Sequence, residues 1–384
     1  MTSSPAPAPS RPVAPERVQL LPGDRAPGFH ARTMQNPQFR FDSVAGRWLV
    51  LGFLGSAAHP EIAARVAAVT EATDQFDDDR ASLFLLSSDP SDETECRLAD
   101  RIPGCRVFWD ADGAVARAYG ALPAAGTAEA GLAYSPAWVL IDPGLTIRRV
   151  VPFRTDGGDV AELLSALRAA PPPEAFLGFE VPAPILVLPD VFEPAFCDHL
   201  IGLYEAAGGA MSGFMRDQDG KTVAVHDPSF KVRRDYIIED EALRAQVQAR
   251  IMRRVLPQIE RVHFFRATRM ERYLVACYDA AEGGHFRPHR DNTTHGTAHR
   301  RYAVSINLNE DFEGGEVSFP EYGPRGYKAP RGGAVIFSCS LLHAVGRVTS
   351  GRRFAFLPFL YDDAAAAIRE RNAAKVPTAA GYRA

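Results

Sequence analysis

Cysteine is scarce in this sequence, and the few cysteines that occur form no recognisable pair or cluster. Among 384 residues there are five, far apart and without a CxxC motif: Cys96, Cys105, Cys197, Cys277 and Cys339. An odd number at this spacing argues against a disulfide framework and against a structural zinc site. We therefore expect a reducing compartment and a cytoplasmic protein.

Long apolar runs and an excess of positive charge are also absent. No apolar run approaches the length of a membrane-spanning helix. The first residues, MTSSPAPAPSRPVAPERVQ, lack the apolar core of a secretory signal. A formal net charge of -4 argues against a general attraction to nucleic acid or to anionic membranes. We expect neither as a partner.

The length of the chain and one proline-rich segment predict two domains. A chain of 384 residues is long for one hydrophobic core. The segment AAPPPE (169–174) would stop a helix and hold an extended spacer. The expected parts are a disordered leader over 1–19, a first domain over 20–168, a linker over 169–184, a second domain over 185–363 and a C-terminal tail over 364–384.

Strands and helices alternate in the first half of the chain. WLVLGFL (48–54) and ASLFLLSSD (81–89) are typical of buried strands, and a helix is expected between them from Pro60. AWVLID and LTIRRVV add two strands before the linker. This alternation predicts a three-layer α/β domain with a mainly parallel sheet.

Three segments of this half resemble a known family. They are PGDRAPGF (22–29), VFWDADGAVARAYG (107–120) and SPAWVLIDPGLTIRRV (135–150). In this order they resemble the peroxiredoxin branch of the thioredoxin-like fold. The resemblance implies a thioredoxin-like domain in which Pro136 takes the place of the cis-proline of that fold, so we predict a cis Ser135–Pro136 bond.

The reactive cysteine that this resemblance would imply is missing. In peroxiredoxins it follows the first buried strand, where a helix N-terminus lowers the pKa of the thiol. Here that segment is GSAAHPEI (55–62), and no cysteine precedes Cys96. We expect a redox-inactive domain that binds a partner or mediates homodimerisation, with Cys96 and Cys105 as half-buried packing residues. The competing hypothesis is a thiol peroxidase that uses one of these two cysteines.

Short strands dominate the second half. A helix is expected over EPAFCDHLIGLYEAA (193–207) and another over about 240–260. From Phe264 onward, strand follows strand between turn residues. This pattern predicts a β-sandwich or barrel with the helices covering one face.

The segment HFRPHRD (285–291) places polar side chains among these strands. Residues two apart in a strand point to the same side, so His289 and Asp291 can meet at one point. His343, which follows the apolar AVIFSCSLL, is the candidate third ligand; the alternative is an ordinary packed residue at a strand end. Two histidines and one carboxylate leave positions open on a metal, as in the non-haem Fe(II) enzymes that activate O₂.

Other basic residues are expected to be solvated. His295 and His299 lie in the polar NTTHGTAHRR, and a zinc cluster of the four histidines between 285 and 299 fits no closed structural site. KVRRDY (231–236) and HRR (299–301) are expected to form a solvated basic face rather than a contact with an acidic substrate.

A bound anionic cosubstrate requires a fixed cation near the metal. Arg352 and Arg353 lie nine and ten residues after His343, so on a strand they point to opposite faces and only one can enter the site. A guanidinium matches a carboxylate through two parallel hydrogen bonds. We expect Arg353 in the site and Arg352 at the surface.

The segments YDAAEGGHFRPHRDN, INLNEDFEGGEVSFP and PRGGAVIFSCSLLHAVGRVTSGRRFAF follow one another in this half. Together they resemble the prolyl-4-hydroxylase-like branch of the 2-oxoglutarate- and Fe(II)-dependent oxygenases. The resemblance implies a double-stranded β-helix (jelly roll) with flanking helices. It also implies that iron is held by His289, Asp291 and His343, and that Arg353 pairs with the distal carboxylate of 2-oxoglutarate.

The same resemblance extends to two further residues and to the reaction. Tyr278 would hydrogen-bond the cosubstrate, and Asn307 lies either beside the cosubstrate or as an ordinary polar residue of the sheet. The implied cofactors are Fe(II), 2-oxoglutarate and O₂, with ascorbate as a further reductant. The implied function is hydroxylation of a C–H bond in a prolyl or other amino-acid-type substrate, protein or small molecule, with release of succinate and CO₂. The alternative is a thioredoxin-like binding or assembly protein with a vestigial oxygenase domain.

Overall fold

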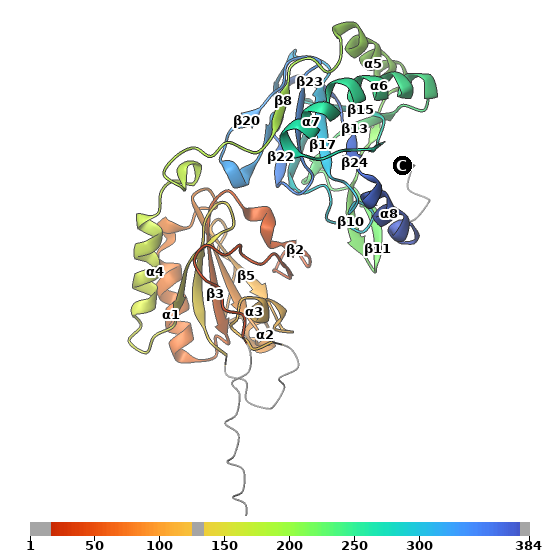
Figure 1. The fold of residues 1–384 in the computed structure, drawn as a ribbon. Helices are drawn as coiled ribbons and strands as arrows, with labels where there is room; N and C mark the ends of the chain where they lie inside the picture. The colour runs from red at the N-terminus through yellow and green to blue at the C-terminus, as the bar shows by residue number, and fades with distance from the viewer. Residues whose placement is uncertain (1–16, 125–133, 377–384) are drawn as a thin grey trace, which may run out of the picture. The chain divides into compact units, whose positions relative to one another are not determined.

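The structure, a computed structural model, describes residues 17–124 and 134–376. Most of the leader expected over 1–19 lies outside the described residues, as does the end of the expected tail. The chain divides into two units, Met1–Gly178 (unit 1) and Phe179–Ala384 (unit 2) (Figure 1). This division falls within the predicted linker over 169–184, and the finer domain bounds stay predictions. Among the described helices, none has the length and the apolar character that crossing a bilayer would require.

Unit 1 is built on a five-stranded sheet in the order β5-β4-β3-β6-β7. Its strands are β3 (Trp48–Gly55), β4 (Ala81–Ser87), β5 (Cys105–Trp109), β6 (Ala137–Ile141) and β7 (Ile147–Pro152). Its helices are α1 (Pro60–Glu71), α2 (Pro90–Thr94), α3 (Ala114–Ala118) and α4 (Gly158–Ala169). The short strands β1 (His30–Ala31) and β2 (Phe39–Arg40) pair with each other ahead of this sheet.

The central strand β3 is apolar along its length because both faces of the sheet are covered. On one face, Trp48 and Val50 share a core with side chains of α1 and α4. Leu49, which points the other way, is fully buried as well, on the face where the rings of Phe84 and Phe108 stack with centroids 4.8 Å apart. The predicted thioredoxin-like, three-layer domain is therefore confirmed.

The prediction of a mainly parallel sheet is wrong. Strands β3, β4 and β5 are parallel, but β6 is antiparallel to both β3 and β7. For β6 and β7 the cause is the tight turn Asp142–Thr146 between them, in which the amide of Asp142 donates to the carbonyl of Thr146. Parallel neighbours need a crossover of a dozen residues or more, and this turn is far too short for one.

The prediction of a cis Ser135–Pro136 bond is also wrong. Within the described residues the cis peptide bond is Ile102–Pro103, in the turn before β5. Pro136 leads directly into β6, and its carbonyl accepts the amide of Phe153 from the neighbouring segment. The Ser135–Pro136 bond therefore has the trans form that is favoured by default.

The described part of unit 2 contains two large antiparallel sheets, a separate two-stranded hairpin and four α-helices. The larger sheet holds β8 (Leu186–Leu188), β9 (Ala210–Met211), β13 (Arg234–Ile237), β14 (Arg269–Glu271), β15 (Leu274–Asp279), β17 (Tyr302–Asn307), β18 (Phe312–Gly314), β21 (Ala334–Ser338), β23 (Val348–Phe356) and β24 (Phe359–Tyr361). The smaller sheet has the order β12-β16-β22-β19-β20, with β12 (Lys231–Val232), β16 (His285–His289), β22 (His343–Val345), β19 (Val317–Ser318) and β20 (Gly326–Tyr327). The remaining elements are the hairpin β10 (Phe214–Gln218) and β11 (Lys221–Val225), and the helices α5 (Pro194–Ala207), α6 (Glu241–Arg254), α7 (Leu256–His263) and α8 (Asp363–Asn372).

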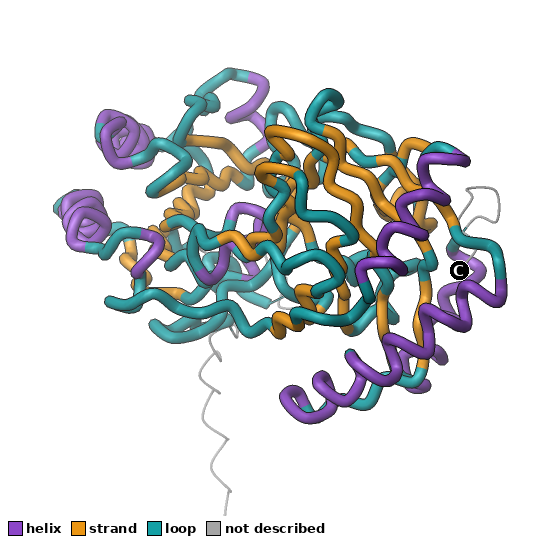
Figure 2. The backbone as a smooth tube through the Cα atoms, turned by 90° about the horizontal axis from the view of Figure 1, so that it is seen from above, coloured by secondary structure: helices purple, strands orange, loops and turns teal. Residues whose placement is uncertain are grey.

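Alternate residues of the larger sheet separate its two faces. Val275, Val304 and Phe356 share one core with apolar side chains of α5, α6 and α7. Tyr278, between these positions in the alternation, packs with Phe286 of the smaller sheet. Helices run beside the strands in Figure 2. The predicted double-stranded β-helix with helices on one face is confirmed, whereas the strands β9 to β13 were not predicted because they are short and rich in charge.

We expect the substitution Asp159→Ala to destabilise unit 1 by about 3–5 kcal/mol, because it leaves a buried charge without its partner. Asp159 on α4 is fully buried; it accepts from Trp138 Nε1 at 2.9 Å and from Arg65 Nε at 3.2 Å. All three tryptophans of the chain lie in unit 1, so denaturation followed by tryptophan fluorescence reports on this unit alone. The exposed Glu71→Ala on α1 is the control, and equal stability of the two variants would contradict the prediction.

Candidate metal centre

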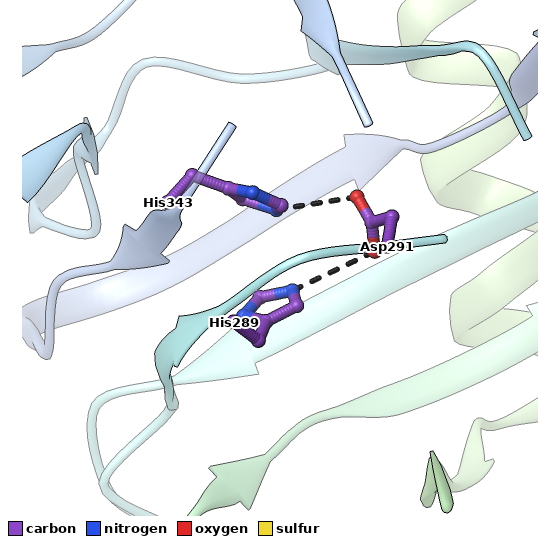
Figure 3. Close-up of side chains that lie close together, drawn as sticks. All are labelled: His289, Asp291 and His343. Atoms are coloured by element: carbon purple, nitrogen blue, oxygen red, sulfur yellow. Dashed lines mark ion pairs between the residues drawn. The ribbon is translucent and has the colours of Figure 1, made fainter. Parts of the chain in front are cut away.

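The pairing of β16 with β22 brings three predicted residues together. His289 lies directly opposite His343 in the antiparallel register, and Asp291 follows two residues after the end of β16. Both imidazole rings point at the Asp291 carboxylate (Figure 3), with Nε2–oxygen distances of 3.6 Å from His289 and 3.2 Å from His343. Their candidate ligand atoms all lie within 4.8 Å of one another, and among the described residues this is the group of three or more that is placed to hold a metal.

Backbone carbonyls fix the orientation of both histidines. Nδ1 of His289 lies 2.7 Å from the carbonyl of Arg287, and Nδ1 of His343 lies 3.0 Å from the carbonyl of Leu341. A carbonyl only accepts, so each Nδ1 carries the hydrogen and each Nε2 has its lone pair free. This is the arrangement of a metal-binding histidine, whose second nitrogen is held by a hydrogen bond.

Burial sets the protonation states of the group. The Phe286 ring stacks on His289 at 3.5 Å between centroids, and Phe337 lies 4.5 Å from His343. Burial, and then the neighbouring His343, lower the pKa of His289 to about 3. Burial alone would raise the pKa of Asp291, but His343 and His289 outweigh it and hold that pKa below its usual range. A neutral imidazole and an ionised carboxylate are the forms that bind a metal.

The donor set fits Fe(II). Two imidazole nitrogens and one carboxylate oxygen on one side of an ion leave the other coordination positions open, as in the non-haem iron oxygenases. A closed structural zinc site would need a fourth protein ligand. The nearby histidines do not supply it, because His295 pairs with Asp217 at 2.7 Å and His299 pairs with Glu271 at 2.8 Å.

Arg353 lies on the inner face of the larger sheet with one donor unused. It is 2% exposed, it lies opposite Tyr278 in the pairing of β23 with β15, and its guanidinium sits 5.4 Å from the centre of the Tyr278 ring. Its Nη2 donates to Ser305 Oγ at 2.8 Å, and its buried Nη1 has no partner among the described residues. Arg352 is half exposed and pairs with Glu205. A buried guanidinium with a free donor is suited to an incoming carboxylate.

Asn307 holds the side chain of Arg353 in place by a hydrogen bond. Its Oδ1 accepts from Nε of Arg353 at 3.0 Å, and its amide nitrogen donates to the carbonyl of Ala329 at 2.7 Å. Gly315, which has a left-handed φ of 69°, lies against the same side chain: a Cβ there would be 3.1 Å from Cδ of Arg353. Asn307 and Gly315 therefore both position the arginine.

Three buried charged residues lie close to His289, Asp291 and His343, which we call the metal group, and were not predicted from the sequence. His299 was expected to be solvated, but it is fully buried, because the loop after Asp291 folds back onto β14. There Glu271 accepts from His299 at 2.8 Å and from Nε of Arg300 at 2.7 Å. Nη1 of Arg300 also lies 3.5 Å from the carbonyl of Asp291. Burial would raise the pKa of Glu271, but Arg300 and His299 outweigh it and lower that pKa to about 2.

In unit 1, carboxylates and hydroxyls surround the segment after β3, where a peroxiredoxin would carry its reactive thiol. After β3, the amide of Ala57 and the hydroxyl of Ser87 both donate to Asp92, at 2.8 Å and 2.6 Å. Cys105 is buried, and burial raises its pKa to about 12, so its thiolate is unfavourable. Cys96 is exposed rather than half-buried as expected, because it follows the early end of α2 in a left-handed conformation, with a φ of 53°.

We expect Glu271→Gln to weaken metal binding by about ten-fold, which is typical when a residue that supports a metal ligand is changed. The amide keeps the shape of the carboxylate but removes the negative charge that Glu271 presents to Arg300, so the loop that carries Asp291 loosens. Titration with Mn(II), followed by electron paramagnetic resonance, measures the affinity. Glu370→Gln on the exposed side of α8 is the control, and an unchanged affinity in folded Glu271→Gln protein would refute the supporting role.

Comparison with known proteins agrees with this division. Residues 273–361 match the model of the 2OG-Fe(II) oxygenase superfamily, and residues 22–150 match that of the AhpC/TSA family. Among solved structures, a Trichoplax adhaerens prolyl hydroxylase in complex with a hypoxia inducible factor peptide is 16% identical, with a TM-score of 0.39 over 48% of this chain and 86% of that chain. The Mycobacterium tuberculosis peroxidoxin BcpB is 20% identical, with a TM-score of 0.34 over 40% and 99%, and a Pseudomonas putida prolyl-4-hydroxylase is 14% identical, with a TM-score of 0.33 over 46% and 92%. The two family matches lie in different units of the chain, and they agree with a fusion of a peroxiredoxin-like, thioredoxin-fold domain and a 2OG-Fe(II) oxygenase domain.

Proposed function

We propose that this chain is an Fe(II)- and 2-oxoglutarate-dependent dioxygenase that hydroxylates a C–H bond. In this reaction R–H, O₂ and 2-oxoglutarate become R–OH, succinate and CO₂. The substrate is a prolyl or other amino-acid-type compound, free or within a protein, as the sequence resemblance implies. The proposal rests on one observation above all: His289, Asp291 and His343 converge with both Nε2 atoms free, on the inner face of a 2OG-Fe(II) oxygenase domain.

Each residue of the site has a distinct task. When bound, Fe(II) supplies the open coordination positions at which 2-oxoglutarate and O₂ are brought together. His289, Asp291 and His343 hold the ion and fix its geometry. The free Nη1 of Arg353 binds the distal carboxylate of 2-oxoglutarate, and Tyr278, opposite it, hydrogen-bonds the same cosubstrate. The rings of Phe286 and Phe337 exclude water from the two imidazoles.

Unit 1 has a separate proposed role. The absence of a cysteine over 55–62 and the burial of Cys105 favour a domain that recruits a partner or a second copy of the chain. The competing thiol peroxidase hypothesis requires peroxide consumption that depends on Cys96 or Cys105. Peroxide consumption unchanged in the double Cys→Ser variant would exclude it.

We expect anaerobic addition of Fe(II) and 2-oxoglutarate to the apoprotein to produce the visible metal-to-ligand charge-transfer band of a chelated cosubstrate. His343→Ala should abolish the band, because one of the three protein ligands is lost. His285→Ala is the matched control, since His285 lies on the same strand as His289 and its ring nitrogens contact the backbone carbonyls of Gly283 and Ser229. If wild-type protein stays folded but gives no band, the oxygenase domain is vestigial and the binding-protein alternative gains support.

We expect Arg353→Met to weaken 2-oxoglutarate binding by roughly 10- to 100-fold, because a hydrogen-bonded charge pair contributes about 1.5–3 kcal/mol. Titration of the cosubstrate against the charge-transfer band measures the change. The neighbouring Arg352→Met removes an exposed guanidinium from the same strand and should leave the affinity unchanged. Equal affinities in the two variants would remove Arg353 from the cosubstrate site.

A further inference from the structure

The basic segment KVRRDY (231–236) is not the solvated face that the sequence predicted. Lys231 and Arg233 are each 4% exposed. The reason is the sheet pairing: β12 adds to the edge of the smaller sheet next to β16, with Lys231 opposite Phe286, and Arg233 follows at the crossing to the larger sheet. Because these basic side chains are buried, their charge has to be balanced by neighbouring groups and not by water.

Lys231 has no counter-charge of its own. Its ammonium donates to Ser212 Oγ at 2.8 Å and to the carbonyl of Gly213 at 2.7 Å, and it lies 4.9 Å from the centre of the Phe286 ring. No carboxylate in the described part of the chain forms an ion pair with it. Burial, and then the nearby Arg233, lower the pKa of this lysine well below its ordinary value. An isolated buried ammonium is costly, and proteins rarely keep one without a use.

The neighbouring carboxylate, that of Asp235, already accepts hydrogen bonds from other side chains. Asp235 receives both Nε and Nη2 of Arg233, at 2.7 Å and 2.6 Å, together with the hydroxyl of Ser212 at 2.6 Å. Arg272, which is one-fifth exposed, reaches the same carboxylate at 3.3 Å. Lys231, Arg233 and Arg272 therefore share the one negative charge of Asp235, and the cluster has an excess of positively charged groups.

The excess of positively charged side chains lies beside the metal group. The Phe286 ring that Lys231 contacts is the ring that stacks on His289 at 3.5 Å. Nη1 of Arg233 lies 3.4 Å from the hydroxyl of Tyr278, whose ring also contacts Arg353. Two cationic positions thus border the site, one through Phe286 and one through Tyr278. The distal carboxylate of 2-oxoglutarate needs only Arg353.

We propose that Lys231 binds a carboxylate of the substrate, so that the enzyme oxidises a carbon of a small carboxylic or amino acid or of the C-terminal residue of a peptide. This inference rests on the proposed oxygenase function and names its substrate class. A substrate carboxylate supplies negative charge that this cluster lacks, and its oxygens can accept the N–H of Lys231 that has no partner among the described residues. A substrate held by an internal peptide bond supplies no such group.

The test uses the full chain loaded anaerobically with Fe(II) and 2-oxoglutarate. The probes are the proteinogenic amino acids, each as the free acid, as its primary amide and as the last residue of a Gly-Gly-X peptide. Two readouts are recorded: the change that each probe causes in the charge-transfer band, and succinate release once O₂ is admitted. We expect at least one acid to perturb the band and raise succinate release, with at least ten-fold weaker binding of its amide. Activity of Gly-Gly-X peptides would identify C-terminal residues as the source of the carboxylate, and activity of the free acids alone would identify small molecules.

The variant Lys231→Met keeps the length of the side chain and removes the charge. The ammonium of Lys231 forms no ion pair among the described residues, so the substitution leaves no buried counter-charge unpaired. We therefore expect an unchanged or higher melting temperature and an unchanged band with 2-oxoglutarate alone. The response to the acid should fall ten-fold or more. Lys221→Met, which removes an exposed ammonium from β11, is the control.

Three results would overturn the inference while leaving the proposed function intact: a normal band that no free acid or peptide perturbs, an equal response to acids and amides, or a full response in Lys231→Met. Absence of the band in wild-type protein would instead reject the proposed function, and the inference with it.

Discussion

The register between β16 and β22 is the constraint on which the metal group depends. His289 and His343 face each other only in this pairing, and a slip of one residue would turn the ligands to the opposite face of the smaller sheet. Both Nδ1 hydrogen bonds run to carbonyls two residues back in the chain, so the same backbone that sets the register also sets the direction of the imidazoles. The ligand geometry is thus a property of the sheet rather than of flexible side chains.

The larger sheet separates stability from chemistry between its two faces. On β15, β17 and β23 the outward residues, among them Cys277, Ile306 and Phe354, pack in one apolar core with the helices. Some of the inward residues between them are polar, as Asn307 and Arg353 illustrate, whereas others, such as Leu274 and Ala276, are apolar. Burying such groups costs free energy unless each is hydrogen-bonded, and the apolar outer face offsets that cost. Strand alternation therefore lets one sheet serve both purposes.

Alternation and spacing also made the site predictable from the sequence. A period of two separates Arg353 from Arg352. It also pointed to the pairing of His289 with Asp291, although Asp291 lies just beyond the end of β16. The partners of buried charges were not predictable in this way, because Glu271 meets Arg300 from a distant strand and Lys231 is buried only by the addition of β12 to a sheet edge. A run such as KVRRDY has the same composition whether it is solvated or buried. The antiparallel pairing of β6 with β7 in unit 1 was not predicted for a related reason. It depends on the short turn between these strands and not on the sequences of the strands themselves.

The thioredoxin-fold unit keeps its packing but not the electrostatics of thiol chemistry. A reactive cysteine needs a positive environment that stabilises the thiolate. At the end of β3 the chain instead places Asp89 and the fully buried Asp92, with one arginine, Arg97, between them. Two carboxylates against one guanidinium would raise the pKa of any thiol introduced at the start of α1. The hydroxyl and amide donors of this corner are already committed to those carboxylates, so the network stabilises the turn into α1 in a form that opposes a thiolate. Restoring thiol chemistry would therefore require more than one cysteine, because the carboxylates that hold this turn would have to be replaced as well.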